Sequence, residues 1–71
     1  MAALFEITEQ GGDAAGSLTW EATRAAILAD NTGEGCDPDP EFIAFVTNAT
    51  IGDEADFGGG AAPVWTLRRI A

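Results

Sequence analysis

Residues 4–8 alternate between the two sides of an extended backbone. Phe5 and Ile7 fall on one side, and the three residues around them fall on the other. A period of two is typical of a β-strand with one buried face. We therefore predict a first strand here, with Phe5 and Ile7 pointing into the core, followed by a glycine-rich loop over residues 10–16.

A helix is predicted over residues 19–30, where alanine recurs. Alanine has the highest intrinsic helix propensity, and Trp20, Ile27 and Leu28 fall near one face of the helix. Thr19 can cap the N-terminus, because a threonine hydroxyl accepts a hydrogen bond from an amide of the first turn. An asparagine and a glycine follow and are typical of a helix end. We expect Trp20 to be packed inside the small core.

A second helix is predicted over residues 40–49. Asp39 is a suitable N-cap, and Pro40 takes the first helical position, where no N–H donor is needed. Apolar residues recur at the i, i+3, i+4 and i+7 positions of one helical face: Phe42, Phe45, Val46 and Ala49. The alternative is a strand, because the segment is also rich in aromatic and β-branched residues.

The last third of the chain predicts two strands. We expect a short strand within residues 51–57 and a final strand over residues 64–70, joined by a glycine-rich loop. The order strand, helix, helix, strand, strand indicates an α+β fold. It would be a single domain over residues 1–71, with two helices on one face of a three-stranded, largely antiparallel sheet. The expected core residues are Phe5, Ile7, Ile27, Leu28, Phe42, Phe45, Val46 and Leu67.

The charge of the chain indicates which kinds of partner it can bind. The chain has 12 acidic residues, three arginines, no lysine and no histidine, which gives a formal net charge of -9. Such a field repels nucleic acids and anionic membranes and speeds encounter with a basic surface. A hydrophobic fraction of 46% indicates a folded domain rather than a disordered acidic tail. Arg68 and Arg69 fall on opposite faces of the final strand, where acids such as Glu6 can pair with them.

Catalytic and metal-binding motifs are missing from the chain. Cys36 is the single cysteine, and the acids around it disfavour a thiolate. Gly58–Gly60 lacks the lysine and hydroxyl residue of a phosphate-binding loop. Asp37, Asp39 and Glu41 are spaced like the start of a calcium loop, but the glycine and distal glutamate of an EF-hand are absent. We therefore expect no enzyme activity, no cofactor and no bound metal.

Eight carboxylates lie in two stretches without a cation and are the candidate partner-binding residues. Five fall within residues 30–41 and three within residues 53–56: Asp30, Glu34, Asp37, Asp39, Glu41, Asp53, Glu54 and Asp56. At the ends of helices and strands, they could dock onto arginines or lysines of a partner. The alternative is a solvated surface that only keeps the chain in solution. Trp65 is a further candidate, as an interface anchor or equally as a core residue.

The expected location is the cytoplasm. The start of the chain has no positive region and no long apolar stretch, so we expect no signal peptide. No apolar run reaches the length of a membrane span. A single cysteine also argues against the disulfide framework of a small secreted domain.

In overall profile, the chain resembles the small acidic anti-CRISPR inhibitors that phages and other mobile elements encode. The likeness rests on its length, its lack of an enzyme site and the cation-free stretches 30–41 and 53–56, and it transfers no residue roles. It implies a protein that binds a CRISPR effector stoichiometrically and blocks recruitment of DNA or nuclease. We expect such a chain to be a monomer or weak homodimer. The alternative is a structural or accessory subunit of a phage particle or bacterial complex, which would self-associate or carry a large apolar patch.

Overall fold

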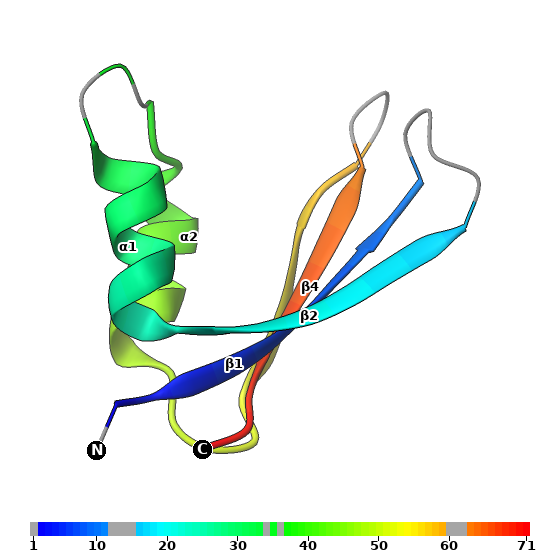
Figure 1. Ribbon diagram of the computed structural model, residues 1–71. Coiled ribbons are helices and arrows are strands. Elements are labelled where there is room, and N and C mark those ends of the chain that lie inside the picture. Colours follow the sequence, from blue (N-terminus) through cyan, green and yellow to red (C-terminus); the bar gives the residue numbers. More distant parts are fainter. Residues whose placement is uncertain (1, 12–15, 34, 36, 60–62) are drawn as a thin grey trace.

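Two helices and four strands form the part of the chain that the computed structural model describes, residues 2–11, 16–33, 35, 37–59 and 63–71. In chain order they are β1 (Leu4–Gln10), β2 (Ser17–Thr23), α1 (Arg24–Thr32), α2 (Pro40–Asn48), β3 (Glu54–Gly58) and β4 (Val64–Arg69). The strands form one antiparallel sheet in the order β2-β1-β4-β3. Both helices cover one end of the sheet, and the far ends of the strands extend away from them in a V (Figure 1). The α+β class of the prediction is therefore confirmed.

The prediction of three strands was wrong, because the first helix does not begin at Thr19. Ser17–Thr23 form a strand instead, and all seven residues pair with β1. Apolar side chains at Leu18, Trp20 and Ala22 alternate with polar ones in this segment, which is the period of a strand. The pairing with β1 outweighs the local helix propensity, and the element order becomes strand, strand, helix, helix, strand, strand.

Each helix begins at a residue whose side chain caps it. Thr23, four residues after the expected cap, accepts a hydrogen bond at its Oγ1 from the amide of Ala26 at 3.2 Å. Asp39 accepts one at Oδ1 from the amide of Glu41 at 2.9 Å, and Pro40 opens α2 as predicted. The helical interpretation of residues 40–49 is confirmed, and the strand alternative is excluded.

The core lies between the helices and the covered end of the sheet. Phe5 and Ile7 of β1 are buried as predicted, against Ile27 of α1, Val46 of α2 and Leu67 of β4. The remaining expected core residues are only partly buried and pack against this group: Leu28, Phe42 and Phe45. Trp20 corrects the prediction, because 42% of it is exposed to solvent.

All three arginines are engaged within the chain. Arg24 donates hydrogen bonds to the carbonyls of Val46 at 2.7 Å and Ala49 at 3.0 Å, and Arg69 donates to the Ala49 carbonyl at 2.8 Å. These bonds neutralise the C-terminal end of α2, where carbonyls lack helical partners and cations are favoured. Arg68 pairs with Glu6 at 3.2 Å on the other face of the sheet, which confirms the predicted cross-strand pair.

Acid should weaken the turn before β3. Asp53 accepts hydrogen bonds from the amide and hydroxyl of Thr50, and these bonds hold the pKa of its carboxyl below the usual value of 3.8. A depressed folded-state pKa stabilises the fold above the unfolded pKa, and this contribution is lost as pH falls through the folded pKa. We expect Asp53→Asn to have a lower Tm than wild type at pH 7. Thermal melts from pH 7 to pH 2 should show this gap close below about pH 4; a constant gap would contradict it.

Candidate partner-binding cleft

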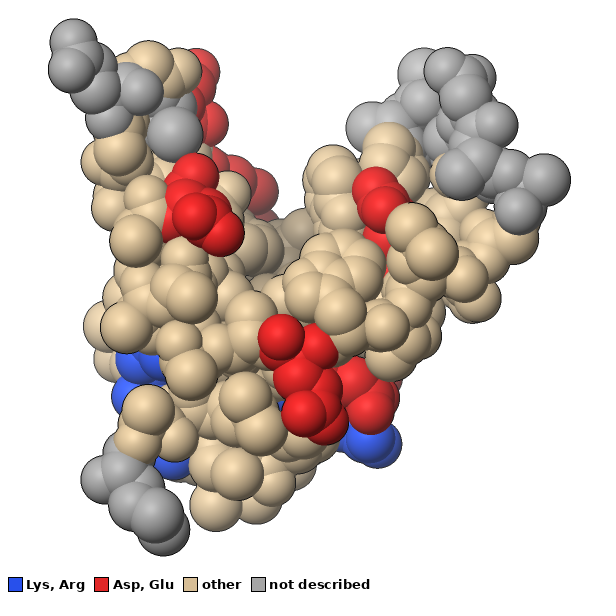
Figure 2. Space-filling view, viewed as in Figure 1, with Lys and Arg blue, Asp and Glu red and all other residues tan. Residues whose placement is uncertain are grey.

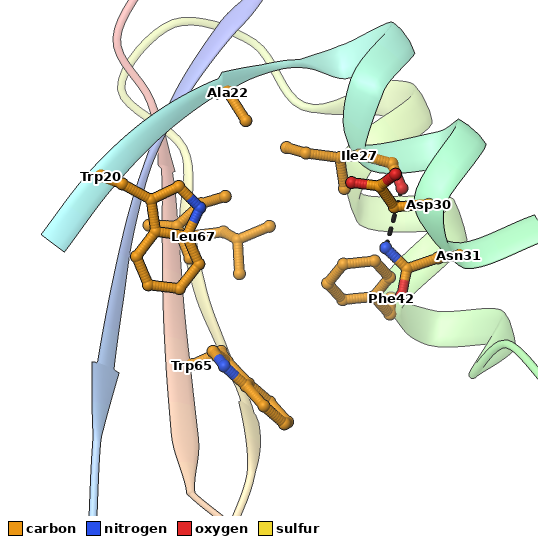
Figure 3. A pocket seen from close by; sticks show the side chains of 9 residues that line it. Trp20, Ala22, Ile27, Asp30, Asn31, Phe42, Trp65 and Leu67 are labelled. Atoms are coloured by element: carbon orange, nitrogen blue, oxygen red, sulfur yellow. Dashed lines mark hydrogen bonds between the residues drawn. The ribbon is translucent and has the colours of Figure 1, made fainter. Parts of the chain in front are cut away.

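A cleft opens where the sheet leaves the helices (Figure 2). Its cavity of about 210 Å³ lies between the sheet, which forms the floor, and the helices, which form the wall, and Figure 3 shows Trp20 and Leu67 facing Ile27 and Phe42 across it. The complete lining is Ile7, Trp20, Ala22, Ile27, Asp30, Asn31, Phe42, Trp65 and Leu67. Small-molecule sites usually measure about 300–1,000 Å³. This first hollow by itself is therefore better matched to one or two side chains of a macromolecule than to a whole ligand.

A second hollow of about 290 Å³ continues the cleft toward β3. The two share Asn31, Phe42 and Trp65, so together they form one groove across the sheet. The second hollow adds Asp37, Pro38, Asp39, Phe57 and Gly58 to the lining. From here on, "the cleft" means both hollows.

Aromatic side chains form the floor of the cleft because the strand register places them on one face. Trp20 and Leu67 both lie opposite Ile7, and Trp65 lies opposite Phe57. The Phe57 ring meets that of Phe42 edge to face at 5.1 Å between centroids. Edge-to-face pairs of this kind hold aromatic rings in place. The floor is therefore preformed, with the indole of Trp20 still partly open to solvent.

Carboxylates from α1 and the loop before α2 form the rim. Asp30 lines the first hollow, and Asp37 and Asp39 line the second. All three are exposed, and the arginines are engaged elsewhere. Figure 2 shows acidic side chains on both arms of the V and the arginines near its base. The groove thus combines an apolar floor with a negative rim.

The structure separates the two acidic stretches that the sequence suggested. Asp30, Asp37, Asp39 and Trp65 meet at the cleft, whereas Glu41 lies exposed in the first turn of α2, outside the lining. Glu34 and Cys36 are outside the described residues.

The second stretch lies away from the cleft. Asp53 is bound to Thr50 in the turn before β3. Asp56 accepts a hydrogen bond from the Thr66 hydroxyl at 2.7 Å, and Glu54 lies opposite Arg68 in the strand register. Asp53 and Asp56 therefore hold local structure, and all three acids lie outside the cleft lining, so the rim carboxylates are the better candidates for partner contact.

Sequence reasoning did not assign Trp20, Asn31, Phe42 or Phe57 to a site. The signal for Trp20 was present in the alternation over residues 17–23, which also places Leu18 and Ala22 on its face. Phe42 and Phe57 were not recognisable, because their partial exposure depends on how far the sheet extends beyond the helices.

Other kinds of site find no support in the described residues. They contain no group of three or more histidine, cysteine, aspartate or glutamate side chains that could hold a metal ion. Among these residues there is also no helix with the length and apolar character needed to cross a membrane. Comparisons with protein-family models, curated proteins and solved structures found no match for this chain. Its function must be inferred from the chemistry of the cleft.

Proposed function

We propose that this chain is a non-enzymatic protein-binding module that docks through the cleft onto a basic surface of a nucleic-acid-binding protein. One observation carries the proposal: Asp37 and Asp39 line an apolar groove while Arg24, Arg68 and Arg69 are engaged elsewhere. Among the described residues, no arginine is left for Asp37 and Asp39, so we expect a partner to supply their cation.

Arginine is the side chain that this groove suits best. Its planar guanidinium stacks on aromatic rings, such as those of Trp20, Phe42 and Trp65, and its donors fork onto carboxylates. Proteins that bind nucleic acids present arginine and lysine to phosphate groups. A module that covers those residues would compete with the nucleic acid. Stoichiometric inhibition of a cytoplasmic effector, as the resemblance to anti-CRISPR proteins implies, is the form of this function that we propose.

Neutralising the rim should weaken capture of such a partner. We compare immobilised wild type with Asp37→Asn/Asp39→Asn and with a control of equal charge on the outer face of β3, Glu54→Gln/Asp56→Asn. Asparagine caps helices as well as aspartate does, so the rim variant keeps the start of α2. From the lysate of the native host, wild type and control should retain the same basic nucleic-acid-binding protein. The rim variant should bind it with an association rate about three- to tenfold lower at low salt.

Added DNA or RNA should release the partner from wild type. Equal association rates for all three baits, or a captured partner without a basic surface, would contradict the proposal. Mass spectrometry identifies the partner, and surface plasmon resonance at several salt concentrations measures the rates.

An accessory subunit remains the second candidate, and one observation favours it. Leu18 and Trp20 are 61% and 42% exposed on the same face of an edge strand, which is a feature of chains that assemble. Opposing it, each copy carries a net charge of -9 and repels another copy. Sedimentation velocity at low and high salt separates the two, because a subunit forms oligomers as concentration rises and a blocker stays monomeric.

A further inference from the structure

The open edge of β2 leaves a row of backbone groups pointing away from the sheet. Arg24 donates its amide proton to the Ala3 carbonyl at 2.9 Å, which extends the β1–β2 ladder by one pair. In antiparallel ladders, bonded and non-bonded pairs alternate. Leu18, Trp20 and Ala22 therefore direct their N–H and C=O groups toward β1. The corresponding groups of three residues point outward: Ser17, Thr19 and Glu21.

The hydrogen bonds between β1 and β4 indicate the same alternation. Ile70 donates to the Leu4 carbonyl at 2.9 Å, so even-numbered residues of β1 bond toward β4 and odd-numbered ones toward β2. Within the described part of the chain, no backbone hydrogen bond reaches the outward groups of Ser17, Thr19 or Glu21. Natural proteins usually protect such an edge with lysine, proline or a covering segment. β2 contains no lysine and no proline, and no described segment forms a backbone hydrogen bond with its outer edge. It has one acidic residue in seven, whereas two of the five residues of β3 are acidic.

From this edge we infer that the partner contributes an extended segment that adds to β2 as a fifth strand, with cationic and apolar residues in alternation. The inference rests on the proposed function and adds a second contact with the same basic partner, separate from the arginine that binds in the cleft. Main-chain hydrogen bonds to the outward groups supply affinity, and the side chains of the segment supply specificity.

Charge on the outer face of the sheet favours cationic residues at alternate positions of the added strand. Glu54, Arg68 and Glu6 lie opposite one another on neighbouring strands, and Glu21 of β2 lies opposite Glu6. The row thus ends at the open edge with two acids side by side, and directly opposed like charges are destabilising. A cation opposite Glu21 on an added strand would continue the row with the sign it lacks.

The cleft face of the sheet favours apolar residues at the remaining positions of the added strand. Leu18 and Trp20 present exposed apolar surface there, next to the edge. Residues of an added strand that neighbour them fall on the same face of the sheet and extend the aromatic floor. A second copy of this chain would fit poorly, because its β2 would bring Glu21 and a net charge of -9 to an edge that is already acidic.

A proline at the open edge tests the inference. Thr19→Pro removes one outward N–H. Proline is tolerated on an edge strand where the missing N–H would face solvent, as the N–H of Thr19 does. Thr19→Val is the matched control, since it also loses the hydroxyl contact to Thr8 but keeps the N–H. The probe is a peptide as long as β2, blocked at both ends, in which arginine and leucine alternate. Fluorescence anisotropy measures its Kd, and circular dichroism verifies that both variants fold.

We expect Thr19→Pro to raise the Kd of the peptide by about tenfold or more, and Thr19→Val to bind the peptide with a Kd within about twofold of the wild-type value. Amide exchange should slow at Thr19 and Glu21 when the peptide is bound. Equal affinity of all three proteins would overturn strand addition while leaving the basic partner of the proposed function in place. Failure of the peptide to bind wild type would also overturn it. If both amides exchange slowly without peptide, and more slowly as the protein concentration rises, a second copy of the chain occupies the edge. That result would also overturn the inference.

Discussion

Replacing Phe5 by alanine is expected to remove a large part of the protein's free energy of unfolding. Phe5 is fully buried, and its ring lies edge-on to Phe45 with centroids 6.2 Å apart and beneath the Arg24 guanidinium at 6.0 Å. Truncations of buried phenylalanine cost about 3–5 kcal/mol. A chain of this length has a free energy of unfolding of about 4–11 kcal/mol at typical values per residue. The substitution therefore removes much of the stability.

Thermal and urea melts measure this effect at physiological salt. The Tm of Phe5→Ala should fall by at least about 12 °C, at 4 °C or more per kcal/mol for a domain of this size. Leu18→Ala is the control, because Leu18 is 61% exposed and its loss should change stability by less than about 0.5 kcal/mol. Similar melting curves for both variants would mean that the core between β1 and the helices is not the source of stability.

The elements that followed from the sequence are those with strong local signals. Phe5 and Ile7 alternate with polar neighbours, and Asp39 with Pro40 marks the start of α2 as predicted. Residues 17–23 carried two signals: alternation favoured a strand, and the alanines that follow favoured a longer helix. The pairing with β1 decides between them, and a pairing partner distant in sequence is not visible in local propensity.

The candidate site could likewise be predicted only in part from the sequence. Clustering of acids in the sequence is local information, and it shows only where carboxylates are dense along the chain. Which of them share a surface depends on the fold: Asp37 lies at the cleft, whereas Asp56 is held by Thr66 on the opposite face of the sheet. The aromatic floor was less accessible still, since Trp20 and Trp65 come together only through their shared neighbour β1.

Loss of the Trp20 indole is expected to abolish most binding without loss of the fold. The side chain lines the cleft, is 42% exposed and borders the open edge of β2. Tryptophans in such positions are typical hot spots, and their truncation costs about 2 kcal/mol or more, which is about 30-fold in Kd. Since little of the buried core is removed, the Tm of Trp20→Ala should stay within a few degrees of wild type.

Intrinsic fluorescence reports this binding directly, because Trp20 and Trp65 are the two tryptophans of the chain and both line the cleft. Titration of the alternating peptide should change the emission of wild type, and Trp20→Ala keeps Trp65 as a reporter. Ile51→Ala is the matched control, since it removes an apolar side chain that is 67% exposed and lies outside the cleft lining. Its affinity should equal that of wild type. If Trp20→Ala and Ile51→Ala bind the peptide equally well, the cleft is not where the basic partner docks, and the acidic surface would act through charge alone. A 30-fold loss confined to Trp20→Ala would instead place the apolar contact beside the β2 edge, where the added strand is expected to run.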